Sequence, residues 1–329
     1  MAKPLVLISA PVPADLREHI EAACETVEIP AGKNPAEELT KEQLEQIEGI
    51  LCTVRTKYNK DVLAALPNLR VLSNFAVGFD NVDVPAATAQ NVLVCNTPKV
   101  LDGAVADITF GLMLCLTRNM VNGDAYVRDG SWAKKGAPAL TRDIRGKTLG
   151  LLGMGRIGGV VARTAKAFDM KVIYHNRNRC EASEAEGLAE YRDRAALFAE
   201  SDFLSVHVPL NDETRHSIGE QEFKSMKTSA YIINTARGAV IDESALIDAL
   251  NSGEIAGAGL DVMATEPLPA DSPLCKMDNV VLQAHVGSGT VETRRAMIDL
   301  AAENMLNALQ SSRPEAMVNP EVWDDRTGN

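Results

Sequence analysis

The chain has 329 residues, 46% of them hydrophobic, a length that suits two domains and an apolar share that is ordinary for a globular protein. Its formal net charge of −12, with no basic stripe to offset it, argues against nucleic acid and anionic membrane as partners. No apolar run approaches membrane-spanning length and residues 1–4 do not open a signal peptide, so we expect a cytoplasmic protein.

The cysteines and histidines are scattered along the chain without the paired spacing of a metal site. We therefore predict no metal. We also predict reduced, mostly buried thiols at Cys24, Cys52, Cys95, Cys115, Cys180 and Cys275.

The first hundred residues alternate short apolar runs, typical of buried strands, with amphipathic stretches, typical of helices. Strands are expected at residues 5–9, 26–29, 50–54, 71–75 and 92–95. Helical stretches are expected between them, at residues 14–24, 38–47, 60–66 and 82–89. Such repeating βα units predict a parallel sheet with helices on both faces. This region has no glycine pattern of its own for binding phosphate.

A break follows at Thr97-Pro98, because the residue before a proline is disfavoured in helical geometry. Beyond it we predict one long helix over residues 101–128, so dense in apolar residues that one domain face is too small to bury them. Two interpretations are equally open: the helix packs against a second subunit, or it is wedged between two domains. A loop around Trp132 comes next.

Residues 147–179 contain the most informative pattern: a strand, a glycine turn, a helix and a second strand. Gly153 permits a tight turn, Gly155 lets a pyrophosphate approach the backbone, and Gly158 lets the helix pack closely on its strand. The N-terminus of such a helix attracts phosphate. An ordinary glycine turn is the alternative, but the strand–helix–strand context favours dinucleotide binding.

The end of the second strand indicates which dinucleotide binds. Where an NAD site places a carboxylate on the ribose 2′-hydroxyl, this chain has Asn176, Arg177 and Arg179. A carboxylate there repels the 2′-phosphate of NADP, whereas an arginine pairs with it. One charge pair at about 4 Å is worth about 4 kcal/mol near a protein surface, which is enough to reverse the cofactor preference. The sequence therefore predicts that NADPH is preferred over NADH. Two solvated arginines in a loop are the alternative.

The remaining chain completes a doubly wound nucleotide-binding domain. Four more strands are predicted at residues 203–208, 230–234, 256–262 and 280–284, with a helix at residues 244–251 that Gly253 ends. A last helix at residues 290–309 carries the chain back to the first domain. The chain would then cross between the domains near residues 98–102 and 286–290, with a cleft between them. The tail after this helix is short and polar.

Three candidate catalytic residues lie just beyond predicted strand ends, where open α/β sheets place their ligands: Arg237, Glu266 and His285. Reducing a 2-oxo acid requires a hydride for the carbonyl carbon, a proton for its oxygen and a cation for the carboxylate. A histidine held by a carboxylate can donate that proton, and the planar fork of an arginine can bind the carboxylate. Each residue alone is more commonly structural, whereas their joint placement favours this chemistry.

Five segments in register carry a family resemblance: GLLGMGRIG, SVHVPLNDETR, NTARG, GLDVMATEP and AHVGSGTVETR. Together they resemble the D-isomer-specific 2-hydroxyacid dehydrogenases, particularly the glyoxylate/hydroxypyruvate reductases, over nearly the whole chain. The resemblance implies an α/β fold with two domains. Residues 1–99 and 289–329 would form a flavodoxin-like substrate-binding domain, and residues 100–288 a Rossmann-type NAD(P)-binding domain with a doubly wound parallel sheet. It also implies a homodimer built on the helix at residues 101–128.

The same resemblance implies roles for individual residues. Arg237, Glu266 and His285 would be catalytic, and Arg237 and His285 would also bind the substrate. The backbone N–H groups of Val77 and Gly78 would bind the substrate carboxylate. Asp261 would contact the nicotinamide carboxamide, or else cap a turn. Besides the three glycines and the residues that follow the second strand, the implied cofactor contacts are Arg156, Ile157, His207, Pro209, Thr214, Thr235 and Gly287.

The implied reaction is NAD(P)H-dependent reduction of glyoxylate, hydroxypyruvate or 2-ketogluconate to the D-2-hydroxy acid. Lys99 stands where the family usually has glycine, and Ala284 replaces a frequent proline before the histidine. Two alternatives remain open. One is a dinucleotide-sensing, corepressor-like binding protein of the same fold, and the other is a dehydrogenase of a phosphorylated acid.

Overall fold

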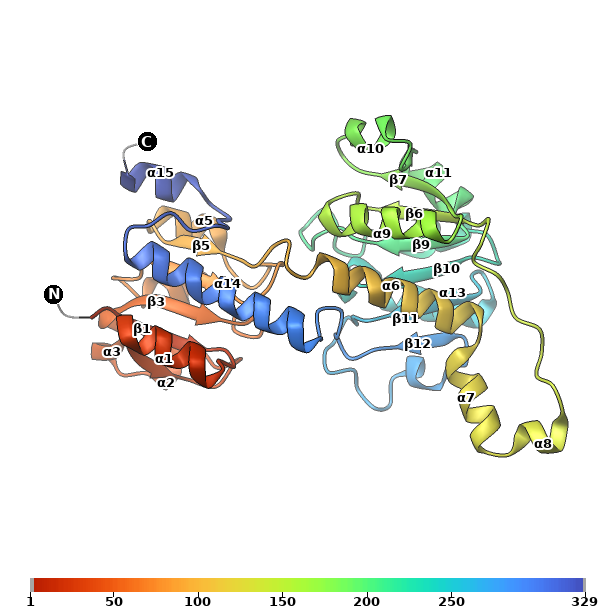
Figure 1. Ribbon diagram of the computed structural model, residues 1–329, viewed down its shortest axis with the longest axis horizontal. Coiled ribbons are helices and arrows are strands. Elements are labelled where there is room, and N and C mark those ends of the chain that lie inside the picture. Colours follow the sequence, from red (N-terminus) through yellow and green to blue (C-terminus); the bar gives the residue numbers. More distant parts are fainter. Residues whose placement is uncertain (1–2, 328–329) are drawn as a thin grey trace. The chain divides into compact units, whose positions relative to one another are not determined.

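The structure is a computed structural model that describes residues 3–327 (Figure 1). It is an α/β protein with two all-parallel sheets, which confirms the predicted fold class. The chain forms two compact units. One comprises the described residues up to Leu101 together with those from Val291 onward, and the other spans Asp102–Thr290.

The first unit has a five-stranded sheet of order β2-β1-β3-β4-β5, the flavodoxin-like doubly wound order. Its strands are β1 (Leu5–Ser9), β2 (Glu25–Glu28), β3 (Ile47–Cys52), β4 (Val71–Asn74) and β5 (Leu93–Cys95). Its helices are α1 (Ala14–Ala23), α2 (Pro35–Glu38), α3 (Lys41–Gln46), α4 (Lys60–Ala64), α5 (Val84–Ala89), α14 (Val291–Leu309) and α15 (Glu321–Thr327).

Helix α14 lies directly on this sheet, against β3, β4 and β5. Close approach is possible because Gly49 has no side chain: a Cβ there would stand 3.1 Å from Leu309 and 3.3 Å from Met305. The Ser73 hydroxyl also donates to the carbonyl oxygen of Ala301 (2.6 Å). The C-terminal segment is thus an integral layer of the first unit.

The second unit has a seven-stranded sheet of order β12-β11-β10-β9-β6-β7-β8. Its strands are β6 (Thr148–Leu152), β7 (Lys171–His175), β8 (Glu190–Tyr191), β9 (Phe203–Val206), β10 (Tyr231–Asn234), β11 (Gly257–Leu260) and β12 (Val280–Leu282). The strand order reverses between β6 and β9, so the crevice beyond their carboxyl ends is the expected ligand site.

Helices cover both faces of this sheet. In one apolar core, the sheet packs against α6 (Asp102–Thr117) and α9 (Arg156–Ala167). In a second apolar core, it packs against α11 (Arg194–Glu200), α12 (Glu220–Ser225) and α13 (Glu243–Ser252). Helix α13 ends at Gly253, whose φ of 74° matches the predicted C-cap. One short helix, α10 (Glu181–Ala185), follows β7.

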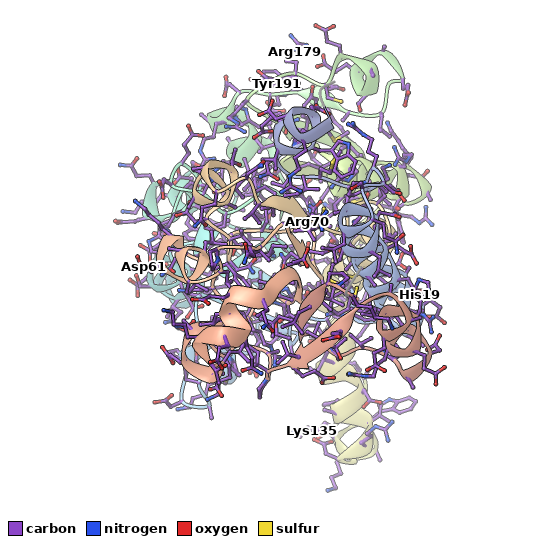
Figure 2. All side chains as sticks on the ribbon, turned by 90° about the vertical axis from the view of Figure 1, so that its left-hand side faces the viewer. His19, Asp61, Arg70, Lys135, Arg179 and Tyr191 are labelled. Atoms are coloured by element: carbon purple, nitrogen blue, oxygen red, sulfur yellow. The ribbon has the colours of Figure 1, made fainter. Side chains whose placement is uncertain are left out.

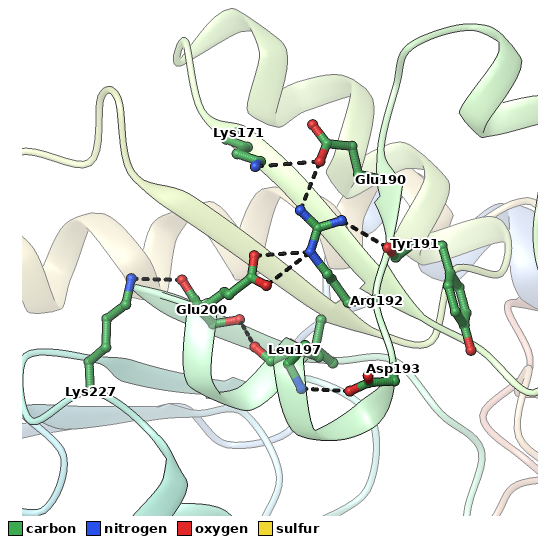
Figure 3. Close-up of polar contacts among 10 residues, drawn as sticks. Lys171, Glu190, Tyr191, Arg192, Asp193, Leu197, Glu200 and Lys227 are labelled. Carbon is green, nitrogen blue, oxygen red and sulfur yellow. Dashed lines mark hydrogen bonds and ion pairs between the residues drawn. The ribbon is translucent and has the colours of Figure 1, made fainter.

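Arg192 fixes the outer edge of this sheet, where β8 ends (Figure 3). Its guanidinium group lies 2.9 Å from Glu190 and 3.0 Å from Glu200 of α11, and Glu190 also pairs with Lys171 of β7 (3.4 Å). This network holds the two-residue strand β8, including Tyr191, beside the loop that follows β7.

Two sequence predictions about helices are wrong. The helix expected over residues 101–128 is broken into α6 and α7 (Met120–Arg128), which meet at 57° around Asn119. Asn119 has a φ of 50°, a left-handed conformation that asparagine tolerates better than most residues. The loop expected around Trp132 contains another short helix, α8 (Ser131–Lys135). The tail is not simply polar either, since α15 buries Val322 and Trp323.

The six cysteines are free, as predicted, but only Cys24, Cys52 and Cys95 are fully buried, and Cys275 is exposed. Between residues 3 and 327 no cluster of three or more histidine, cysteine or carboxylate side chains could hold a metal ion.

In the same range no single helix is long and apolar enough to cross a membrane. The bent pair α6 and α7 reaches the necessary length and hydropathy only when the two helices are counted together.

Candidate active site

The glycine loop between β6 and α9 has the geometry of a phosphate cradle. Gly153 has a φ of 101°, and a Cβ there would stand 2.7 Å from the carbonyl group of His207. A Cβ on Gly158 would stand 2.3 Å from the carbonyl oxygen of Gly153, whereas Gly155 faces open space. No side chain caps the N-terminus of α9, where Arg156 and Ile157 begin the helix. The loop therefore fits a dinucleotide pyrophosphate.

Asn176 connects the end of β7 to this loop, because its side-chain oxygen accepts a hydrogen bond from the N–H group of Met154 (2.6 Å). The two arginines that follow have separate partners. Arg177 is exposed and pairs with Glu213 (3.3 Å). Arg179 pairs with Glu184, and its guanidinium carbon lies 5.0 Å from the ring centroid of Tyr191 (Figure 2). Each arginine is thus held by a carboxylate, and their contact with the ribose stays a prediction.

The residues predicted on the adenine side form one turn after β9. The N–H group of His207 donates to the carbonyl oxygen of Leu152 (2.8 Å), and its Nε2 lies 2.9 Å from the hydroxyl of Ser205. Burial lowers the pKa of His207 to about 4, so the ring is neutral at physiological pH. The Thr214 hydroxyl donates to the carbonyl oxygen of Pro209 (2.6 Å), which closes this turn.

His285 and Glu266 form a hydrogen-bonded pair after β12 and β11. The Nδ1 atom of His285 lies 2.7 Å from Oε2 of Glu266, whose Oε1 accepts from the N–H group of Met263 (3.1 Å). Burial acts to raise the pKa of Glu266, but the hydrogen bond and charge of His285, with the charge of Arg237, hold that pKa below its usual value. Glu266 is therefore a carboxylate at neutral pH and fixes the imidazole ring.

The backbone of His285 is in an unusual left-handed conformation, with a φ of 55°. Asp261, only 1% exposed, holds it there. Its carbonyl oxygen accepts from the His285 N–H group (2.8 Å), and its carboxylate accepts from those of Val286 (2.7 Å) and Gly287 (2.8 Å). Of the two roles expected for Asp261, the described contacts are those of a turn cap. A Cβ on Gly287 would stand 2.9 Å from this carboxylate, so a side chain there would disturb it.

Arg237 follows β10 in a turn held by Asn234, a buried residue outside the sequence predictions. The Asn234 side chain accepts from the N–H group of Ala236 (3.0 Å) and donates to the carbonyl oxygen of Arg237 (2.9 Å). The next residue must be glycine, because a Cβ on Gly238 would stand 1.9 Å from the backbone of Met263. This contact brings the Arg237 turn against the segment that leads to Glu266.

The loop with Val77 and Gly78 belongs to the first unit, and buried asparagines hold it. Asn96 donates to the carbonyl oxygen of Val77, and Asn74 to that of Gly78, both at 2.8 Å. Asn74 also donates to the side chain of Asn81 (3.2 Å). The N–H groups of Val77 and Gly78 donate to no residue between 3 and 327, so they can bind an anion. The three asparagines were missed because no local spacing connects them.

A doubly wound sheet with a glycine-cradled helix N-terminus at its reversal point places the second unit among Rossmann-type nucleotide-binding domains. Residues 110–287 match the family model "D-isomer specific 2-hydroxyacid dehydrogenase, NAD binding domain". A glyoxylate reductase from Thermofilum pendens is 41% identical over 327 residues, which cover 98% of this chain and 96% of that relative.

Solved structures of related reductases match the fold of this chain. A glyoxylate reductase from Paecilomyes thermophila has a TM-score of 0.90 at 35% identity, over 98% of this chain and all (100%) of that one. An NADPH-dependent glyoxylate/hydroxypyruvate reductase from Sinorhizobium meliloti, in complex with NADP and malonate, has a TM-score of 0.89 at 33% identity, over 96% of this chain and 97% of that one. The chain belongs to the D-isomer specific 2-hydroxyacid dehydrogenase family, which confirms the resemblance of its motifs.

Proposed function

We propose that this protein reduces a small 2-oxo acid, glyoxylate first, to the D-2-hydroxy acid with a nicotinamide dinucleotide as hydride donor. The observation that carries the proposal is the His285–Glu266 pair at 2.7 Å, in a chain about 40% identical to glyoxylate reductases. In this proposal residues 100–288 bind the dinucleotide, and residues 1–99 with 289–329 bind the substrate. Hydroxypyruvate and 2-ketogluconate are the further proposed substrates.

The residues divide the chemistry as follows. In the second unit, Arg237 binds the substrate carboxylate, which orients the carbonyl group. In the first unit, the N–H groups of Val77 and Gly78 offer donors to a carboxylate. A nicotinamide dinucleotide held at the glycine loop of Gly153, Gly155 and Gly158 would supply the hydride to one face of the carbonyl carbon. As the carbonyl π electrons move to oxygen, His285 donates its Nε2 proton to that oxygen, and Glu266 stabilises the imidazolium before the transfer. Solvent then reprotonates His285.

A substrate panel tests the function. We expect the absorbance of NADPH to fall when the protein is mixed with glyoxylate, and also with hydroxypyruvate or 2-ketogluconate. A phosphorylated 2-oxo acid in the same panel tests the second alternative, which faster reduction of that acid would favour. Binding of NADPH without turnover of any 2-oxo acid would instead favour the corepressor-like alternative.

We further propose that NADPH is preferred, because Arg177 and Arg179 stand beside Asn176 where an NAD site has a carboxylate. Replacing Asn176 with aspartate and Arg177 with alanine should raise the KM for NADPH about tenfold or more and lower that for NADH, because the new carboxylate repels the 2′-phosphate and can accept from the 2′-hydroxyl. Conversely, Glu213→Gln should lower the KM for NADPH, because it frees Arg177 from its ion pair.

Steady-state kinetics with both cofactors measures this preference. Arg145→Ala is the matched control, since this exposed arginine pairs with Asp169 away from the glycine loop. A wild-type KM for NADH no higher than that for NADPH would contradict the preference.

A homodimer is proposed through α6, α7 and the segment that follows them. In Figures 1 and 2 this arm, residues 119–143, extends away from the rest of the second unit, with Lys135 near its tip. Its large apolar side chains are more than half exposed, a pattern typical of a protein interface: Met120, Val121, Val127, Trp132 and Leu140.

Replacing Val121 and Val127 together with aspartate should convert the dimer to monomer, because two desolvated carboxylates would be unpaired in an apolar contact. Sedimentation equilibrium measures the mass, and Lys41→Asp, on an exposed face of the first unit, is the control for added negative charge. A wild-type protein that sediments as a monomer would refute the interface.

A further inference from the structure

Asp102, the first residue of α6, carries a buried carboxylate that the mechanism above does not use. The residue is 8% exposed. Its Oδ2 atom lies 3.6 Å from Nε of Arg156, and its Oδ1 atom has no hydrogen-bond partner within residues 3–327. A buried oxygen acceptor without a donor is unfavourable and uncommon in a folded protein, and it calls for an explanation.

The position of Asp102 along the fold indicates what could supply the donor. Arg156 begins α9 directly after Gly155, at the expected pyrophosphate position. One turn further along α6, Val105 lies 3.5 Å from where a Cβ of Gly287 would be, beside the Asp261 carboxylate. In the next turn, the Thr109 hydroxyl lies 3.3 Å from that of Thr235.

The N-terminal half of α6 therefore runs from the expected pyrophosphate end of the dinucleotide site to its expected nicotinamide end. Asp102 stands at the beginning of that path. At neutral pH the phosphates of a dinucleotide offer only hydrogen-bond acceptors. The ribose that joins the pyrophosphate to the nicotinamide is the next group along the molecule, and its hydroxyl groups are donors.

We propose that Asp102 is a cofactor-binding residue whose Oδ1 atom accepts a hydrogen bond from a hydroxyl group of the nicotinamide-side ribose. The inference rests on the proposed binding of a nicotinamide dinucleotide. Burial raises the pKa of Asp102, and the charge of Arg156 opposes that rise. A hydrogen bond from the ribose hydroxyl to Oδ1 would stabilise the charged carboxylate. The ion pair to Arg156 holds the second oxygen, which leaves Oδ1 for the ligand.

The test truncates both the side chain and the ligand. Binding of NADPH, 2′-phospho-ADP-ribose and 2′-phospho-ADP is measured by calorimetry for wild type, Asp102→Ala and Asp102→Asn. The parallel set NADH, ADP-ribose and ADP removes any dependence on the 2′-phosphate. The alanine variant should bind both ribose-bearing ligands of a set about tenfold or more weakly, with a smaller loss for asparagine. Binding of 2′-phospho-ADP or ADP should be unchanged or tighter, because Arg156 is released toward the pyrophosphate.

Thermal unfolding without ligand separates this role from a structural one. Asp102→Ala should raise the Tm of the ligand-free protein, since it removes an unsatisfied buried carboxylate and leaves Arg156 half exposed to water. Asp107→Ala, at an exposed position of the same helix, is the control and should change neither Tm nor binding.

A Tm that falls in Asp102→Ala, or equal losses for ligands with and without the ribose, would overturn the inference. A wild-type protein that binds these dinucleotides but reduces no 2-oxo acid would refute the proposed function instead. In that case the calorimetric comparison of ligands with and without the ribose would still test the contact of Asp102.

Discussion

Replacing His285 with asparagine is expected to lower kcat for glyoxylate reduction about a hundredfold or more, the usual scale for loss of a general acid. Asparagine is the better test than alanine, because His285 has a φ of 55° and asparagine tolerates this conformation. The variant therefore keeps the turn that Asp261 holds while it removes the titratable proton. Stopped-flow single turnovers measure the hydride step itself, apart from product release.

The pairing with Glu266 predicts a second, distinct signature. Glu266 has a lowered pKa and is charged at neutral pH. It loses that charge only when the pH falls through this lowered pKa, so the decline of the reduction rate at acid pH should be absent from Glu266→Gln. The pH dependence of kcat/KM measures this change.

His19 offers the matched control. It is exposed and pairs with Glu303 (3.3 Å), as His285 pairs with Glu266, but it belongs to the first unit, whereas His285 and Glu266 belong to the second. His19→Asn should leave kcat and the pH profile unchanged. If His285→Asn retained wild-type kcat, His285 would not be the proton donor. If Glu266→Gln kept the wild-type pH profile, the charge of Glu266 would not support the reaction.

The local parts of the site could be predicted from the sequence because each rests on a short-range steric demand. The turn at Gly153 requires a positive φ, and the close approach at Gly158 excludes a Cβ, whatever the rest of the chain does. Residues at strand ends could be found in the same way, since parallel strands place their carboxyl ends at one edge. Arg237 and His285 follow directly from that rule.

The supporting contacts could not be predicted, because they join residues that no spacing relates. Asp261 reaches the backbone N–H group of Gly287, 26 positions away, and Asn96 reaches the carbonyl oxygen of Val77, 19 positions away. The break at Asn119 was missed for a different reason. The apolar density around it continues a helical pattern, whereas the break depends on one residue adopting a left-handed conformation.

Replacing Arg237 with alanine should reduce kcat/KM for glyoxylate roughly a thousandfold, or about 4 kcal/mol of transition-state binding, the sum expected for two hydrogen bonds to charged groups. The loss should appear in KM as well as in kcat, since the carboxylate is bound before and during hydride transfer. Arg237→Lys keeps the charge but loses the planar fork, so it should recover only part of the loss.

Arg237 also acts on the catalytic pair, and this effect can be separated from substrate binding. Its charge is among the causes that lower the pKa of Glu266, so Arg237→Ala should raise that pKa, and Arg237→Lys should not. A carboxylate with a higher pKa is protonated earlier as the pH falls. The acid limb of the kcat profile should therefore move to higher pH in the alanine variant alone.

Binding of oxamate, an unreactive isostere of a 2-oxo acid, isolates the carboxylate contact from the chemistry. Its inhibition constant should rise in step with the KM for glyoxylate in both arginine variants, while NADPH affinity stays at the wild-type value. Arg145→Ala is again the control for loss of an arginine from the same unit. Unchanged oxamate inhibition in Arg237→Ala would mean that another cation binds the substrate. The turn held by Asn234 and Gly238 would then serve only to lower the pKa of Glu266.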